Sequence, residues 1–222
     1  MQPLAKRVVA EALGTFFLLA AVVGSGIMAE RLAGGNTALA LLANTAATGA
    51  ALIALIISFA PLSGAHFNPV VTLSFALRHD LLWREVGVYV PAQVAGGIGG
   101  VIAANLMFDL PAVFLSQHPR TGVAQLFSEF IATLGLVSVI LAASRSTVAV
   151  VAVAVGAYIT AAYWFTASTS FANPAVTIAR SLSDTFAGIR PVDTPGFVIA
   201  QFAGGIAATV LFRWLMPTRR SE

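Results

Sequence analysis

The sequence predicts an all-α membrane protein with six transmembrane helices and two re-entrant half-helices, arranged as an inverted repeat. Three observations predict this fold class: the composition, six long apolar runs, and two copies of a polar segment that interrupts the apolar sequence. Of the 222 residues, 58% are hydrophobic and 9% are charged, and the mean hydropathy is +0.89. Average domains carry about a quarter charged residues, so a soluble domain is excluded.

Six segments approach the roughly 20 apolar residues that span a bilayer. They are expected at about 8–28, 37–60, 86–108, 124–143, 147–168 and 195–216. Lys6 and Arg7 precede the first segment, as they would in a signal peptide, but its apolar run is too long and contains Glu11. We therefore expect this segment to be retained. The chain has no cysteine, which excludes disulfides, thiolate metal sites and thiol redox switches.

Two polar segments, SGAHFNPVVT and STSFANPAVT, each reach an Asn-Pro pair and then resume as an apolar helical pattern. Asn68 and Asn173 are predicted N-cap residues, with Pro69 and Pro174 at the first helical position. Both of the following apolar patterns are too short to cross a bilayer. Short broken helices at corresponding places in two halves of a membrane protein indicate a transport site between them.

The rest of the chain repeats in the same way. PAQVAGGIGG returns as IAQFAGGIAA, and EALGTFFL returns as EFIATLGL. Residues 1–222 are therefore expected to form a single transmembrane domain, with one repeat at about 1–110 and the second at about 121–222, joined by a link at 108–120. Three spans per repeat is an odd number, so the second copy must be inserted in the opposite direction.

The distribution of basic residues predicts that both termini lie in the cytoplasm. The predicted inner segments hold Lys6, Arg7, Arg78, Arg84, Arg145, Arg213, Arg219 and Arg220. The predicted outer segments hold Arg31, Arg120, Arg180 and Arg190. This excess of basic residues inside follows the positive-inside rule.

The twin motifs resemble those of the aquaporin and glycerol-facilitator family, the major intrinsic proteins, and the similarity runs nearly the length of the chain. The resemblance implies the aquaporin fold, a homotetramer with one pore per subunit, and a place in the bacterial inner (plasma) membrane. Its pore motifs correspond to Asn68, Pro69, Val70, Asn173, Pro174 and Ala175. No nucleophile-base set, metal-ligand cluster or nucleotide motif is present, so neither an enzyme nor a cofactor is expected, and nothing indicates nucleic acid.

Two carboxylates, Glu11 and Glu129, lie inside predicted spans. Each is expected on the same side of the membrane as its own re-entrant loop, where it can accept hydrogen bonds from buried loop amides. Gln93 and Gln201 are expected to act similarly, as buried hydrogen-bonding groups between helices. The competing interpretation is a proton-coupled transporter that uses these acids as relays. That interpretation requires an acid near the midplane, and the sequence places none there.

His66 precedes the first Asn-Pro pair. Two roles remain open for it: a structural hydrogen-bonding group of the loop scaffold, or a residue that lines the pore, as the family usually has.

The expected selectivity filter departs from the family's pattern. Most relatives have Arg two positions after the second Asn-Pro pair, and this chain has Val176. Counting without gaps from the motifs, the other filter positions are Thr48, Ala161 and Ser170. A ring of these four residues carries no charge and no large side chain, so we expect a wide filter. Val70, where Ala is usual, narrows the midplane slightly.

Arg180 stands one helical turn beyond Val176 on the same face. It either lines an outer vestibule or acts as an interfacial residue that caps loop carbonyls or pairs with Asp184.

The half-helix ends favour passive conduction of neutral solutes over cations. Without the filter Arg, the chain resembles the bacterial branch associated with arsenic resistance, which implies neutral or methylated arsenicals and polyols as solutes. The alternatives are a general glycerol and water facilitator, a channel mainly for water and, in other classes, a proton-coupled secondary transporter or a non-conducting structural membrane protein.

Overall fold

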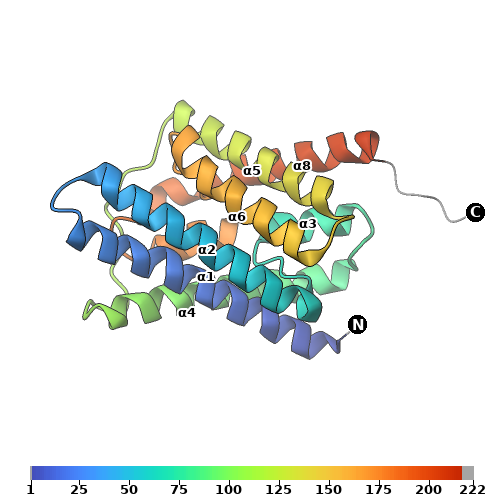
Figure 1. The fold of residues 1–222 in the computed structure, drawn as a ribbon, viewed down its shortest axis with the longest axis horizontal. Coiled ribbons are helices and arrows are strands. Elements are labelled where there is room, and N and C mark those ends of the chain that lie inside the picture. Colours follow the sequence, from blue (N-terminus) through green and yellow to red (C-terminus); the bar gives the residue numbers. More distant parts are fainter. Residues whose placement is uncertain (1, 217–222) are drawn as a thin grey trace, which may run out of the picture.

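The computed structural model describes residues 2–216, which form a bundle of helices. The elements are α1 (Leu4–Leu32), α2 (Thr37–Ser63), α3 (Pro69–Leu77), α4 (Trp83–Met107), α5 (Val123–Ala143), α6 (Val148–Phe165), α7 (Pro174–Arg180), the 3₁₀ helix η1 (Pro191–Asp193) and α8 (Thr194–Leu215). The order long, long, short, long therefore occurs twice. Helix α1 begins and α8 ends at the same end of the bundle, at the right of Figure 1.

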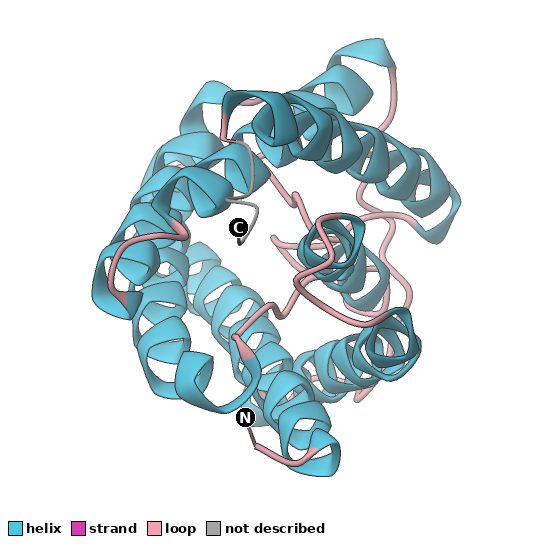
Figure 2. Ribbon diagram, turned by 90° about the vertical axis from the view of Figure 1, so that its right-hand side faces the viewer, coloured by secondary structure: helices cyan, strands magenta, loops and turns pink. Residues whose placement is uncertain are grey.

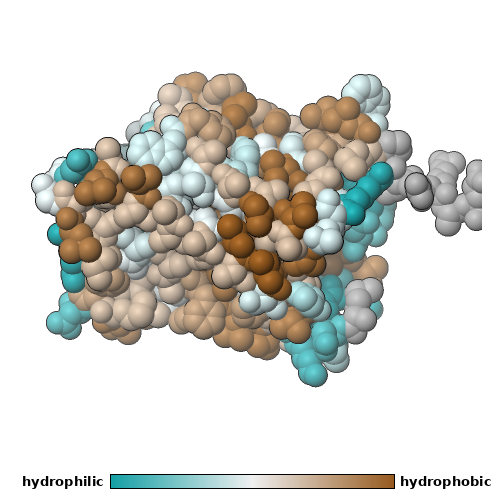
Figure 3. All heavy atoms as spheres, viewed as in Figure 1, coloured by the Kyte–Doolittle hydropathy of each residue, from teal (hydrophilic) through white to brown (hydrophobic). Residues whose placement is uncertain are grey.

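Among the described residues, six helices are long and apolar enough to cross a membrane. The predicted all-α fold of six spans with two shorter helices is therefore confirmed. Large hydrophobic side chains cover the outer faces of these helices, and the most hydrophilic residues gather at the two ends of the molecule (Figure 3). This distribution suits a protein surrounded by hydrocarbon, since only the ends then meet water and headgroups. Arg219 and Arg220, counted above as inner charges, lie outside the described residues.

The half-helices α3 and α7 begin where the Asn-Pro pairs predict. The side-chain oxygen of Asn68 accepts a hydrogen bond from the amide of Val70 at 2.9 Å. That of Asn173 accepts from the amides of Ala175 at 3.0 Å and Val176 at 3.3 Å. Each Asn thereby satisfies first-turn amides that have no partner within the helix, and proline follows at the position where an amide hydrogen is not needed.

The long helices approach closely at glycines. A Cβ atom on Gly100 of α4 would come closer than 3.0 Å to the backbone of Phe16 in α1, and one on Gly204 of α8 would meet the backbone of Phe130 in α5. Small residues of this kind let helices pack in a membrane, where no hydrophobic effect drives them together. Viewed along the bundle, the long helices form an outer ring, with loops and a short helix inside it (Figure 2).

Helix α1 extends beyond its predicted span at both ends, whereas α6 is shorter than predicted. The added first turn of α1 contains one member of a further charged pair. Arg7 in α1 and Glu85 in α4 are each 9% exposed and form an ion pair at 2.8 Å, and Arg7 also donates to the hydroxyl of Tyr89 at 2.8 Å. Tyr89 in turn donates to the carbonyl of Ser63 at the end of α2. These bonds tie α1, α2 and α4 together at the end of the bundle where the chain begins.

We predict that Gly100→Ala lowers the free energy of unfolding by about 1–3 kcal/mol, because the new methyl group would meet backbone that cannot move aside. Thermal unfolding in detergent, followed by circular dichroism, measures the change. Gly87→Ala on the same helix is the matched control, since nothing lies within 4 Å of its added Cβ. Equal melting temperatures for the two variants would contradict the close packing of α1 and α4.

Candidate channel site

The two Asn side chains bind each other's loops at the centre of the molecule. The amide nitrogen of Asn68 donates to the carbonyl of Ala172 at 2.8 Å, and that of Asn173 donates to the carbonyl of Phe67 at 2.8 Å. These reciprocal bonds join the starts of α3 and α7. An Asn amide carries two hydrogens, so each side chain keeps a second donor beyond its bond to the opposite loop.

Glu11 holds the loop that precedes α3. Its carboxylate is fully buried and accepts bonds from the amides of His66 at 3.0 Å and Phe67 at 2.7 Å. The hydroxyl of Ser63 and the side-chain amide of Gln93 also donate to it, at 2.6 and 2.8 Å. A single carboxylate thus supplies the acceptors that an irregular backbone in a membrane otherwise lacks.

Glu129 plays the same part in the second half. Its buried carboxylate accepts bonds from the amides of Phe171 and Ala172, both at 2.9 Å, and from the side chain of Gln201 at 2.6 Å. Gln201 also donates to Thr177 at 2.8 Å, as Gln93 does to the corresponding threonine of α3 at 2.9 Å. The expectation that both glutamines are buried hydrogen-bonding groups between helices is confirmed.

Several loop residues beside these carboxylates have positive φ angles, which residues other than glycine rarely adopt. The φ angles are 52° at Ala65, 48° at Phe67, 51° at Ser170 and 48° at Ala172. Such left-handed conformations cost on the order of 1–3 kcal/mol each and persist only where the surroundings enforce them. The amides of Phe67 and Ala172 are held by Glu11 and Glu129, and those of Ala65 and Ser170 by serine hydroxyls two residues earlier. The carbonyls of Phe67 and Ala172 accept bonds from the two Asn side chains.

A cavity of about 310 Å³ lies beside the Asn pair, with residues of both halves in its wall. Ser144 and Ser146, between α5 and α6, line it toward one end, and Arg180 lines it beyond the Asn residues. Most of its wall is apolar, with contributions from Leu18, Leu52, Ile56, Val155 and Ile159. Both Asn residues belong to the wall, so the starts of the two half-helices present polar groups to a largely apolar passage.

Three of the four expected filter residues, Thr48, Ser170 and Val176, line this cavity. They are joined by Tyr163 of α6, whose hydroxyl lies 3.3 Å from the hydroxyl of Thr48. The Ser170 hydroxyl is buried and has no hydrogen-bond partner among residues 2–216. This part of the wall therefore presents three hydroxyl groups and one branched apolar side chain.

The expectation for Ala161 is wrong. Ala161 is exposed on the outer face of α6 and does not line the cavity. The wall of α6 consists of Val151, Val155, Ile159 and Tyr163, which follow each other at intervals of four residues. Ala161 lies two residues from this row, about 200° around the helix from its neighbours in it. Counting back from Asn173 without gaps therefore selected the opposite face.

His66 also lines the cavity. Its Nδ1 atom lies 3.1 Å from the hydroxyl of Thr72, and its ring packs against Phe75 at 4.7 Å and Tyr89 at 5.7 Å between centroids. The residue therefore combines the two roles left open by the sequence, since one face of it is held by the scaffold and part of it meets the cavity.

Arg180, the last residue of α7, is 2% exposed and lines the cavity. Its Nε donates to the carbonyl of Ala187, and its guanidinium lies over the ring of Phe171, 3.4 Å from the centroid. It does not pair with Asp184, whose carboxylate instead accepts a bond from the amide of Gln117 at 2.8 Å. Arg180 therefore both caps a loop carbonyl and lines the cavity.

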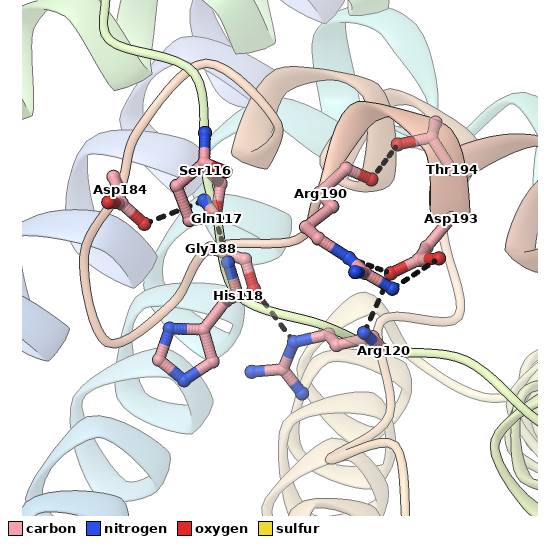
Figure 4. Close-up of polar contacts among 9 residues, drawn as sticks. All are labelled: Ser116, Gln117, His118, Arg120, Asp184, Gly188, Arg190, Asp193 and Thr194. Carbon is pink, nitrogen blue, oxygen red and sulfur yellow. Dashed lines mark hydrogen bonds and ion pairs between the residues drawn. The ribbon is translucent and has the colours of Figure 1, made fainter.

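The segment between the halves covers this end of the site. The carbonyl of His118 accepts from the amide of Arg190, and the side chain of Arg120 donates to the carbonyl of Gly188 at 2.7 Å (Figure 4). Arg120 also donates to the carbonyl of Ser168 at 3.1 Å. The link therefore ties the loop before α7 to the loop after it, in addition to joining the two halves.

Comparison with known proteins decides the family. The model of the family described as "MIP: Major intrinsic protein" matches residues 2–148 and 143–222. The chain belongs to the major intrinsic protein family. It is 58% identical to "Aquaglyceroporin AqpS" of Rhizobium meliloti (strain 1021) over 217 residues, which cover 98% of this chain and 93% of that protein. It is 33% identical to "Aquaporin NIP1-4" of Oryza sativa subsp. japonica over 213 residues, 91% and 74% of the two chains.

The fold of this major intrinsic protein also matches a solved structure. The X-ray structure of the aquaglyceroporin from Plasmodium falciparum superposes with a TM-score of 0.77, covering 97% of this chain and 98% of that one at 20% sequence identity. The aquaporin fold predicted from the twin motifs is thereby confirmed.

Two residues at or near the site were not predicted from the sequence as site residues. Tyr163 could have been found from the four-residue periodicity of α6, since Val151, Val155 and Ile159 precede it on the same face. Arg120 had no such signal, because it lies in an irregular link and reaches the loop of α7 only in the folded chain.

We predict that Glu129→Gln lowers the free energy of unfolding by about 2–3 kcal/mol, because an amide group would replace one acceptor of a buried loop N–H. Titration of the purified protein with a denaturing detergent measures the free energy of unfolding. Glu30→Gln, at an exposed position of α1, removes the same charge and is the control. If both variants kept the stability of the parent protein, the carboxylate would not be what holds the loop.

Proposed function

We propose that the chain is a passive channel for small uncharged solutes that carry several hydroxyl groups, with neutral or methylated arsenicals and polyols as the solutes. Its filter has no Arg two positions after the second Asn-Pro pair, where Val176 stands. Membership of the family makes this a multi-pass membrane protein of the aquaglyceroporin kind, a channel for small solutes.

The observation that carries the proposal is the group of hydroxyls in the cavity wall. Thr48, Tyr163 and Ser170 line the cavity together with Val176, and the Ser170 hydroxyl has no partner within the described chain. An unpaired buried hydroxyl favours a permeant that can bond to it. Val176 beside these groups offers an apolar contact. A solute with hydroxyl groups around a small core can use both kinds of surface at once.

Neutral arsenous acid and glycerol share this chemistry, since each presents three hydroxyl groups. Tyr163 lines the cavity and Ala161 does not, so the wall includes a larger side chain than expected from the sequence and gains a hydroxyl that Ala161 could not supply. Away from these hydroxyl groups much of the wall is apolar, so a solute gains few bonds there and leaves readily.

The transporter alternative lacks support at its central point. A proton relay needs an acid that changes its bonding as the solute passes. Glu11 and Glu129 are each held by several hydrogen bonds, and neither belongs to the cavity wall. A structural membrane protein, for its part, needs no cavity lined by paired Asn side chains.

We predict that Val176→Arg strongly reduces the permeability of proteoliposomes to glycerol and neutral arsenous acid and preserves that to water. The larger side chain would occupy space that Val176 leaves open in the cavity wall. Light scattering in a stopped-flow instrument measures the shrinkage and re-swelling of the vesicles with each solute.

Val153→Arg is not a useful control, because an exposed lipid-facing position would bear the charge. Val176→Leu is the better one, since it adds volume without charge or donors and should retain most of the glycerol flux. Wild-type vesicles that pass water and neither larger solute would contradict the proposed substrate class.

Assembly and orientation belong to the same proposal. By family analogy the chain is a homotetramer in the bacterial inner membrane, built as one channel domain from two inverted repeats. Its basic residues favour both termini in the cytoplasm.

We predict that a membrane-impermeant maleimide labels Gln117→Cys in intact spheroplasts and labels Arg84→Cys only after the membrane is opened. Both positions are exposed, and the chain has no cysteine of its own to give a background. Labelling in the reverse pattern would place the termini outside.

A further inference from the structure

Arg180 is a buried cation without an acidic partner. It is 2% exposed, and its one hydrogen bond among residues 2–216 runs from Nε to the carbonyl of Ala187. The terminal amino groups of the guanidinium therefore have no hydrogen-bond acceptor within that part of the chain. No carboxylate of the described residues lies within 4.0 Å of it.

The acids nearest in the fold are already engaged. Glu129 accepts bonds from the loop before α7 and from Gln201. Asp184 accepts from the amide of Gln117, and Asp193 accepts from Arg190 and from the amide of Arg120. None of these carboxylates can turn toward Arg180 without giving up a bond that holds the loops.

Two other features stabilise the charge where it is. The guanidinium lies on the face of the Phe171 ring, and it stands at the C-terminal end of α7, where the helix dipole is negative. The guanidinium of Arg120 also lies near this ring, 4.9 Å from its centroid. The group beside Arg180 is therefore a second cation and not an acid. The local charge at this end of the cavity is therefore positive.

Arg180 and Val176 occupy one face of α7. They are four residues apart, about 6 Å along a helix, and both line the cavity. Arg180 thus lines the same passage as Tyr163 and Ser170, one helical turn beyond Val176.

We propose that Arg180 is the residue that excludes cations from this pore, and that its free N–H groups bind the oxygen atoms of neutral solutes entering at this end. The inference rests on the proposed passive channel. It assigns to Arg180 a specificity-determining role that a capping residue would not have. An unpaired charge in a narrow passage repels a cation with little screening, while a hydroxylated solute gains a donor.

The test uses proteoliposomes of the full chain with wild type, Arg180→Met, Arg180→Gln and Arg180→Lys. Glycerol permeability is measured by light scattering, and potassium leak is measured in the same preparation from potassium-loaded vesicles. Arg180→Gln loses the charge and can keep a donor to the Ala187 carbonyl. Either neutral variant tests the role of the charge, provided that it inserts into the membrane and remains monodisperse.

Arg31→Met is the matched control. Arg31 also donates to a loop carbonyl, that of Phe108, and lies over the ring of that residue at 5.1 Å. It is exposed and does not line the cavity. Its loss removes a cation from the same end of the molecule without changing the passage.

We expect wild type, Arg180→Lys and Arg31→Met to pass glycerol with the potassium leak of protein-free vesicles. The neutral Arg180 variants should pass glycerol and raise the leak by at least about tenfold. A neutral variant that passes glycerol and stays tight to potassium overturns the inference, as does a wild type that already leaks. A wild type that passes no glycerol instead contradicts the proposed function, and does so independently of Arg180.

Discussion

A backbone that leaves its helical path inside a membrane needs hydrogen-bond acceptors that water cannot supply there, and two buried carboxylates supply them here. Glu11 accepts the amides of the loop before α3, and Glu129 those of the loop before α7. With these bonds in place, residues such as Phe67 and Ala172 can hold left-handed conformations. The site depends on that, because the carbonyls of these two residues anchor the opposite Asn side chains.

The remaining architecture follows from the same arrangement. Once the two loops are fixed, α3 and α7 start from one point at the centre of the molecule, and their first turns are capped by the Asn residues that line the cavity. The long helices close around the loops by packing at glycines. Both acids belong to this scaffold, and among residues 2–216 the cavity wall contains hydroxyls, amides and an arginine but no carboxylate.

The sequence was sufficient for whatever depends on local pattern. The spans follow from length and hydropathy, and the half-helix starts follow from Asn-Pro, because N-capping involves residues two or three positions apart. The placing of the filter fared less well. Thr48, Ser170 and Val176 line the cavity, and Ala161 does not. The position in α6 was found by counting residues from Asn173 across an irregular segment, and the length of that segment determines which face of α6 the count reaches. An irregular segment has no period from which that length can be read.

What the sequence by itself determined is thus the class of the fold, the number of spans, the internal repeat and the identity of the capping residues. Only the tertiary structure decided which face of α6 meets the cavity, and that Tyr163 supplies a hydroxyl to it. It likewise decided that Arg180 faces the passage and caps Ala187 while Asp184 bonds elsewhere. The physical reason is the range of the interactions. Capping and helical periodicity act between near neighbours, whereas the bonding partner of a buried arginine depends on which distant loops the completed fold brings beside it.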